Sequence, residues 1–189
     1  MAGNNPVYYW DTCIFLAWLR NETTRKPGDM EGIHNCLERV KKRQISIMTS
    51  VITITEMTSL RLPAGVETMF EEVMQRPNCA KIGVDMRVAK LARDLRNYYL
   101  AKSDIYSGKT IATPDALHLA TAILYKSDEF HTFDSKDQPK NNSLGLLQLN
   151  GDVGGHNLIV CRPPEDKQAS ILFPQTSFDG DENNPKSQH

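Results

Sequence analysis

Two short strand-like runs, each followed or ended by an aspartate, constrain the fold of this chain most. Residues 7–10 (VYYW) lead into Asp11, and residues 130–133 (FHTF) lead into Asp134. An apolar segment that suits a buried helix follows Asp11, and another, at residues 116–125, precedes the second run. Strands that alternate with helices predict βα units and a mainly parallel sheet, hence the α/β fold class. In such sheets, ligands bind beyond the carboxyl ends of the strands.

Apolar periodicity and turn residues place the other elements. We expect Asp29 to cap one helix and Thr113 to cap another, in which Pro114 takes the first position and Asp115 lies in the first turn. Residues 50–62 carry conflicting signals, because their β-branched residues favour a strand while their polar register also fits a helix. The remaining expectations are strands at 45–49, 80–84 and 158–160, helices at 12–20, 66–74 and 85–100, a turn of helix at 144–149, and a mobile loop at 103–112.

Length and charge indicate one ordinary globular domain. The chain has 189 residues, and its 22 Lys and Arg against 23 Asp and Glu give a formal charge of −1, so strong non-specific nucleic-acid binding is not indicated. We expect a single domain at residues 1–163 and a polar, disordered tail at residues 164–189. Neither a signal peptide nor a membrane span is found, which predicts a cytoplasmic protein. No CxxC pair occurs, so neither a zinc site nor a redox motif is indicated by the four cysteines, Cys13, Cys36, Cys79 and Cys161.

Acidic residues recur at the places where such a sheet would build a site. Taken alone, Asp115 in a first helical turn or Asp134 in a turn has an ordinary structural explanation. Crowded carboxylates, however, repel one another and take up protons, and a divalent cation resolves that conflict. Ligands that are all oxygen suit Mg²⁺ or Mn²⁺ rather than zinc. The acids in question are Asp11, Glu56, Asp115, Asp134 and Asp137.

Four motifs carry these acids in order along the chain. They are YYWDTCIFLAWL around Asp11, SVITITEM around Glu56, TPDALHLATAI around Asp115 and FHTFDSKD around Asp134. Together they resemble the PIN-domain family, most of all the VapC-type toxin ribonucleases of bacterial toxin–antitoxin pairs. The resemblance covers residues 7–163. It implies a three-layer α/β/α sandwich with a mainly parallel sheet of about five strands.

The resemblance also implies metal-dependent hydrolysis of RNA phosphodiesters to 5′-phosphate and 3′-hydroxyl products. Asp11, Glu56, Asp115 and Asp134 would be the catalytic and metal-binding acids, and Asp137 matches a more variable metal ligand of the family. One or two Mg²⁺ or Mn²⁺ ions would be bound, with Glu56 acting through water. The resemblance places Glu56 on a helix, and so decides between the conflicting signals around it.

Other polar residues near the acids have smaller expected roles. Thr132 and Ser50 would cap or support their neighbours rather than catalyse. His118 shares a helix face with Asp115, but we expect a packed helix residue there. His131 lies within a strand and has no assigned role. The candidate basic residues for contacts with RNA are Lys41, Lys42, Arg43, Arg87, Lys90, Arg93 and Lys109.

Two further functions stay open beside a toxin endoribonuclease. A housekeeping RNA-processing nuclease of the same family would have the same acids, whereas a non-catalytic protein- or RNA-binding module would not need all four. A phosphatase of the haloacid-dehalogenase type is excluded, because Cys13 stands where its second aspartate belongs. The partners expected for a toxin are its RNA substrate, a small antitoxin and a second copy of the chain, with no membrane.

Overall fold

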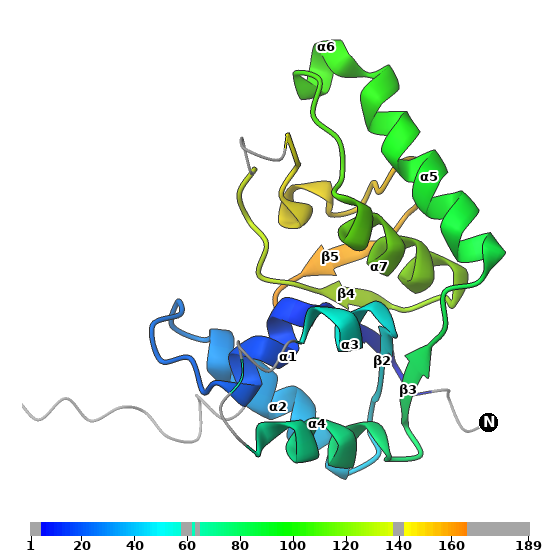
Figure 1. Cartoon of the computed structure of the whole chain (residues 1–189). Coiled ribbons are helices and arrows are strands. Elements are labelled where there is room, and N and C mark those ends of the chain that lie inside the picture. The colour runs from blue at the N-terminus through cyan, green and yellow to red at the C-terminus, as the bar shows by residue number, and fades with distance from the viewer. Residues whose placement is uncertain (1–4, 58–61, 63–64, 138–141, 166–189) are drawn as a thin grey trace, which may run out of the picture.

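A single parallel sheet of five strands forms the middle of the molecule (Figure 1). The computed structural model describes residues 5–57, 62, 65–137 and 142–165, so the predicted tail lies almost wholly outside the described residues. Every neighbouring pair of strands is parallel, in the order β3-β2-β1-β4-β5. The strands are β1 Val7–Trp10, β2 Ser46–Ser50, β3 Cys79–Ile82, β4 Glu129–His131 and β5 Ile159–Cys161. The predicted fold class and parallel sheet are thus confirmed.

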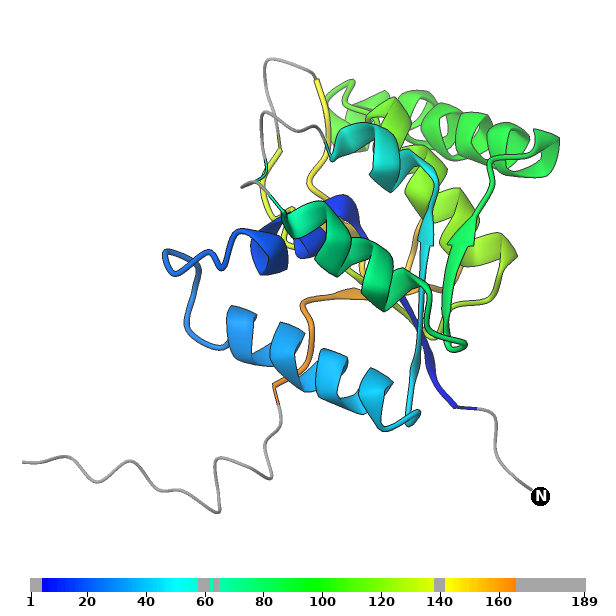
Figure 2. The same ribbon diagram turned by 60° about the horizontal axis from the view of Figure 1, so that its bottom comes forward.

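Helices cover both faces of this sheet (Figure 2). One face carries α1 Thr12–Leu19, α2 Asp29–Lys41 and α4 Val66–Met74, and the other carries α5 Met86–Ala101 and α7 Thr113–Leu124. Three short helices complete the described part of the chain: α3 Ile52–Glu56, α6 Ser103–Tyr106 and the 3-10 helix η3 Leu146–Leu149. None of the helices in this part of the chain has the length and apolar character to cross a membrane.

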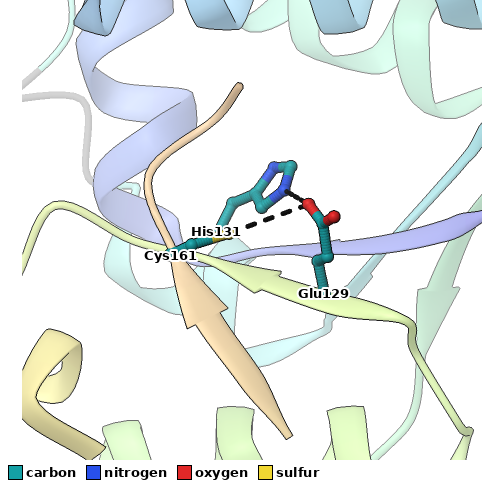
Figure 3. A group of neighbouring side chains, drawn as sticks. All are labelled: Glu129, His131 and Cys161. Carbon is teal, nitrogen blue, oxygen red and sulfur yellow. Dashed lines mark hydrogen bonds and ion pairs between the residues drawn. The ribbon is translucent and has the colours of Figure 1, made fainter. Parts of the chain in front are cut away.

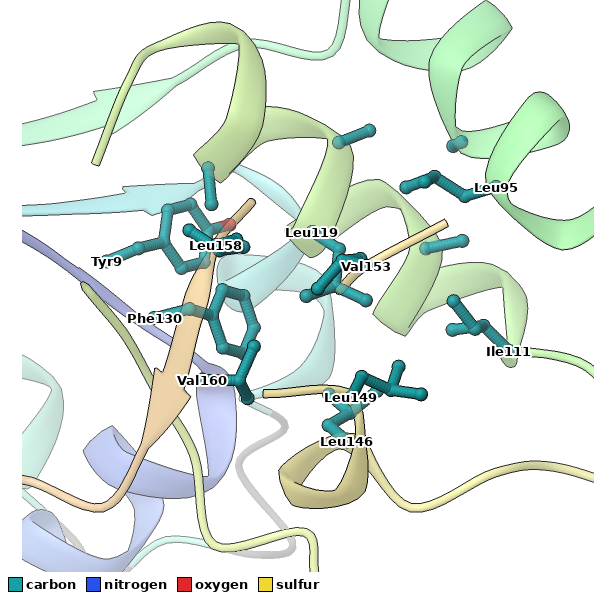
Figure 4. Close-up of a cluster of buried hydrophobic side chains, with 14 of the residues drawn as sticks. Tyr9, Leu95, Ile111, Leu119, Phe130, Leu146, Leu149, Val153, Leu158 and Val160 are labelled. Atoms are coloured by element: carbon teal, nitrogen blue, oxygen red, sulfur yellow. The ribbon is translucent and has the colours of Figure 1, made fainter. Parts of the chain in front are cut away.

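Alternation along the strands divides the core into two apolar layers. In β1, Tyr9 faces α5 and α7, whereas Tyr8 and Trp10 face α1 and α2. Tyr9 stacks on Phe130 of the neighbouring strand, with ring centroids 5.0 Å apart and planes inclined by 6° (Figure 4). Such side chains, buried on both faces of the sheet, explain why β1 reads as a continuous apolar run.

Two predicted helix caps are wrong by one position. Asp29 is the first residue of α2, and the cap is Gly28, with a φ of +87° that favours glycine. Thr113 is likewise the first residue of α7, which Ala112 precedes in extended conformation. The loop expected at residues 103–112 also contains a helical turn, α6.

The first part of the conflicting segment after β2 forms a helix, as the family resemblance implies, while its residues 58–61 lie outside the described residues. Ile52–Glu56, β-branched except for the glutamate, make up α3, a helix of 5 residues that contacts β2 and α7. Because β-propensity measures packing on a pleated surface, it does not apply where the chain has already left the sheet.

The chain leaves β5 by crossing the start of α2. Arg162 donates two hydrogen bonds of 2.7 Å to the buried carboxylate of Asp29, which explains why that carboxylate does not cap the helix. Further on, the Asn35 side chain donates to the Pro164 carbonyl at 3.0 Å. Gly32 makes room for this crossing, because a Cβ there would lie 2.2 Å from the Pro163 carbonyl oxygen.

We expect Gly32→Ala to destabilise the protein. Alanine gains up to about 1 kcal/mol of helix propensity, but overpacking against a backbone carbonyl outweighs this gain and leaves a net loss of about 1–3 kcal/mol. Urea denaturation measures the difference in the free energy of unfolding. Gly83→Ala is the control, because nothing lies within 4 Å of its Cβ position. A Gly32→Ala protein as stable as the wild type would contradict the crossing.

Candidate functional site

Four of the five predicted acids lie at the carboxyl edge of the sheet. Asp11 directly follows β1, and Asp134 lies a few residues beyond β4. Glu56 ends α3, and Asp115 lies in the first turn of α7. Strands β1 and β4 are adjacent and parallel, and α3 contacts α7, so elements far apart in the sequence bring these side chains together.

Electrostatics shows that the four acids share one environment. Burial raises the pKa of Asp115 to about 7, with further increases from the negative charges of Asp11, Asp134 and Glu56. Burial also raises the pKa of Asp134, and Asp11 adds to this effect, although the Leu146 amide opposes it by donating at 3.3 Å. A group of carboxylates whose charges raise the pKa values of Asp115 and Asp134 is a place that attracts positive charge.

Hydrogen-bond donors hold the buried carboxylate of Asp11 in place. Its Oδ1 accepts from the backbone N–H of Thr12 at 2.7 Å, which caps α1. Its Oδ2 accepts from the hydroxyl of Thr132 at 2.8 Å and from the thiol of Cys13 at 3.2 Å. The Thr132 hydroxyl in turn accepts from the backbone N–H of Asp134 at 3.1 Å, so one threonine links two of the acids.

His118 belongs to this site, which sequence reasoning missed. The expectation of a packed helix residue is correct as far as burial goes, because the side chain has no exposed surface. Its Nε2 nevertheless lies 3.1 Å from Glu56 Oε2 and 3.9 Å from Asp11 Oδ1. Burial lowers the pKa of His118, but the hydrogen bond with Glu56 and the charge of Asp11 outweigh it and raise the pKa overall. The signal in the sequence was its position three residues after Asp115.

Asp137 has a different environment from the other four acids. Its carboxylate accepts from Lys109 Nζ at 2.7 Å and from the Gly145 amide at 3.0 Å, and it also accepts from the Gln148 side chain. The hydrogen bond with Lys109, followed by that with Gly145, lowers the pKa of Asp137 to about 2. In this arrangement its oxygens join two loops, while its charge still contributes to the raised pKa of Asp134.

A second group of ligand-type side chains lies on the sheet face covered by α1 and α2 (Figure 3). The ligand atoms of Glu129, His131 and Cys161 lie within 4.8 Å of one another, the one such trio in the described part of the chain. Trp10 Nε1 donates to His131 Nδ1 at 3.1 Å, and an indole nitrogen can only donate. Nδ1 is therefore the acceptor, and the proton sits on Nε2, which lies 2.7 Å from Glu129 Oε2.

This hydrogen-bond arrangement does not fit a metal centre. A histidine that binds a metal through one nitrogen usually donates from the other, whereas His131 accepts there. Burial lowers the pKa of His131 and keeps it neutral, and the hydrogen bond with His131 lowers the pKa of Glu129. The trio is a satisfied polar pair with a neighbouring thiol inside the core.

The carboxyl edge fits a hard divalent cation better, by the chemistry of its donors. Carboxylate oxygens from four elements converge there, and their mutual repulsion is the condition that bound positive charge relieves. No three of these acids bring ligand atoms within the 4.8 Å spacing of the other trio. The four acids are thus close enough to repel one another yet more widely spaced than that core trio.

Comparisons with known proteins agree with the fold. A family model for the PIN domain matches residues 8–141. A VapBC2 complex from Rickettsia felis, solved bound to a DNA fragment from its promoter, aligns with a TM-score of 0.53 and 16% sequence identity, covering 82% of this chain and 96% of that chain. A toxin–antitoxin complex from Klebsiella pneumoniae aligns with a TM-score of 0.41 and 21% identity, covering 84% of this chain and 99% of that one. Among curated proteins, none matches this chain.

We expect Asp115→Asn to stabilise the protein in metal-free buffer, and only at higher pH. The folded pKa of about 7 exceeds the unfolded value of about 4, so the folded state binds more protons between these values and wild-type stability falls as the pH rises. Because asparagine does not ionise, the variant does not lose stability in this way as the pH rises. At pH 8 the variant gains up to about 4 kcal/mol, from three pKa units at about 1.36 kcal/mol each.

Thermal melting in EDTA from pH 4 to pH 8 measures this difference. The gain should be nearly absent at pH 4, where the carboxyl is protonated in the folded state and about half protonated in the unfolded state. Asp94→Asn on the exposed face of α5 is the control and should show no pH-dependent gain. If the difference in stability between Asp115→Asn and the wild type stays the same from pH 4 to pH 8, the crowding of the acids is contradicted.

Proposed function

Because the chain belongs to the PIN-domain family, we propose that it is a metal-dependent endoribonuclease that hydrolyses phosphodiester bonds in RNA. The observation that carries this proposal is the convergence of Asp11, Glu56, Asp115 and Asp134 at the carboxyl edge, where the charges of the other three raise the pKa of Asp115 and that of Asp11 raises the pKa of Asp134. A purely structural domain has no need to bury mutually repelling carboxylates, since each such contact destabilises the fold.

In this proposal Asp11, Asp115 and Asp134 hold one or two Mg²⁺ or Mn²⁺ ions, and Glu56 contributes through water. When bound, such an ion polarises a phosphate, lowers the pKa of water and stabilises a leaving oxygen. Thr132 and Cys13 donate to Asp11 and so fix the orientation of its carboxylate. This leaves the acid oxygens in set positions before any ligand arrives, which is how a site lowers the cost of organising charge.

The proposed reaction consumes one water molecule. A water oxygen forms a bond to phosphorus, the bond from phosphorus to the 3′ oxygen breaks, and the 3′ oxygen takes up a proton. The products are a 5′-phosphate and a 3′-hydroxyl. In this proposal Glu56, at the end of the short helix α3, orients the attacking water, and its side chain accepts hydrogen bonds from Thr12 and His118.

We also propose that the protein is the toxin of a toxin–antitoxin pair, with a small antitoxin as its partner. The motifs around the four acids support this proposal, and the fold shared with the Rickettsia felis complex is consistent with it. A second copy of the chain is the other proposed partner. Coexpression with the product of an adjacent small gene, followed by purification on a tag carried by one protein, tests the pairing.

We expect Asp134→Asn to abolish RNA cleavage. Purified protein is incubated with a mixed RNA substrate in Mg²⁺, in Mn²⁺ and in EDTA. The wild type should cut only with metal, and Asp134→Asn should be slower by at least about 100-fold, because the site loses one of its negative charges. Mn²⁺ should also raise the melting temperature of the wild type but not of the variant.

The surface variant Asp94→Asn serves as control and should cut like the wild type. An unchanged melting temperature in Mn²⁺ together with no cleavage in either metal would reject the nuclease and leave a binding module. Cleavage that persists in EDTA would reject the role of the metal.

Asp137→Asn should impair cleavage much less than Asp134→Asn. The Asp137 carboxylate already accepts from Lys109, so its removal loosens the loops at residues 107–112 and 142–148 rather than emptying the acid cluster. Parallel rate measurements on the two variants decide the point. An equal loss of rate, with an equal loss of the Mn²⁺-dependent melting shift, would make Asp137 a metal ligand.

A further inference from the structure

A histidine with no exposed surface lies between the sheet core and the acid cluster. On one side, His118 Nδ1 lies 2.7 Å from Tyr9 Oη. On the other, Nε2 lies 3.1 Å from Glu56 Oε2 and 3.3 Å from Thr12 Oγ1. We propose that His118 is a positioning residue that holds the Glu56 carboxylate in the site, an inference that rests on the proposed nuclease function.

The contact between His118 and Glu56 holds in either protonation state of the histidine. The Tyr9 hydroxyl lies 2.7 Å from Nδ1 and can donate to it when the imidazole is neutral. A neutral imidazole that accepts at Nδ1 donates from Nε2, and the acceptor there is Glu56. An imidazolium would donate from Nε2 in the same way, so the contact with Glu56 does not depend on the protonation of His118.

Glu56 needs such a contact because of where it lies. It is the last residue of α3, which has only 5 residues and no side-chain cap. A glutamate side chain has three rotatable bonds, and fixing them costs entropy. Thr12 donates to the same oxygen, Oε2, at 2.5 Å, so a hydroxyl and an imidazole fix the carboxylate from two elements, α1 and α7.

The anchor of this network is rigid. Tyr9 is fully buried in the middle strand and stacks on Phe130 (Figure 4). Thr12 lies beside a second chain of hydroxyls, in which Thr53 lies 2.6 Å from Thr49, and Thr49 donates to the Trp10 carbonyl at 2.8 Å. The sheet therefore supports the position of Glu56 through buried side chains.

Two substitutions at position 118 separate positioning from packing. His118→Leu removes the imidazole donor to Glu56 and leaves the Thr12 donor in place, while His118→Gln keeps an amide N–H that can replace Nε2. We expect His118→Leu to weaken Mn²⁺ binding, measured by titration calorimetry, by about 10–100-fold, and His118→Gln to recover most of it. The kcat for RNA cleavage should fall with Mn²⁺ affinity, while the KM for RNA stays within about twofold, because His118 makes no contact with bulk solvent.

A double-mutant cycle with Glu56→Gln tests the route of the effect. In the Glu56→Gln background, His118→Leu should add little further loss of Mn²⁺ affinity, because the partner it holds has lost its charge. Thr121→Val is the matched control on α7. It removes a buried hydroxyl that donates to the Leu117 carbonyl, and it should leave Mn²⁺ affinity unchanged.

Several outcomes would overturn the inference. A folded His118→Leu protein that binds Mn²⁺ like the wild type would do so, as would an equal loss in the Glu56→Gln background. Should His118→Leu fail to fold, Tyr9→Phe takes its place, since it removes only the donor to Nδ1. A several-fold loss of Mn²⁺ affinity supports the proposal, and no loss overturns it.

Failure of the proposed function gives a different result. A wild type that neither binds Mn²⁺ nor cuts RNA rejects the nuclease. The cycle is then run on urea denaturation in EDTA, where coupling between positions 118 and 56 supports the positioning contact and strict additivity overturns it.

Discussion

Repulsion among carboxylates at the carboxyl edge of a parallel sheet is the constraint on which the rest of this structure depends. Burial withdraws the water that would screen these charges, which is why the pKa of Asp115 reaches about 7. Neighbouring side chains donate hydrogen bonds to the charged groups. Thr132 and Cys13 donate to Asp11, and Thr12 and His118 donate to Glu56. The two apolar layers on either side of the sheet provide the stability that offsets this unfavourable cluster.

The sequence predicted the sheet well because its signals are local. An apolar run followed by an aspartate is visible at Asp11 and Asp134, and parallel strands necessarily end at the same edge. The helix caps were wrong because a distant residue decided one of them. Asp29 is a good capping residue by type, but its carboxylate accepts hydrogen bonds from Arg162 instead. No residue near Asp29 in the sequence indicates this distant partner. The assignment of the acids as metal ligands stays a prediction.

Two buried histidines show that residue type alone does not predict which hydrogen-bond partners a side chain has. His118 and His131 both have no exposed surface, and both lie beside a glutamate. Their second partners differ: Tyr9 can donate or accept, whereas the indole of Trp10 can only donate. One histidine therefore joins the acid cluster and the other completes a core hydrogen-bond chain. Burial could be predicted from the apolar neighbours in the sequence, but the identity of the second partner is set by strand register and helix packing.

The contact between Arg162 and Asp29 also has a meaning for how the chain folds. Its two residues are 133 positions apart in the sequence. Closing so long a loop costs conformational entropy, and this cost is smaller when the intervening strands and helices have already formed. During synthesis, α2 leaves the ribosome long before Arg162 has been added to the chain. Asp29 can therefore gain this partner only after the last strand has been synthesised, and the ion pair then joins the end of β5 to the start of α2.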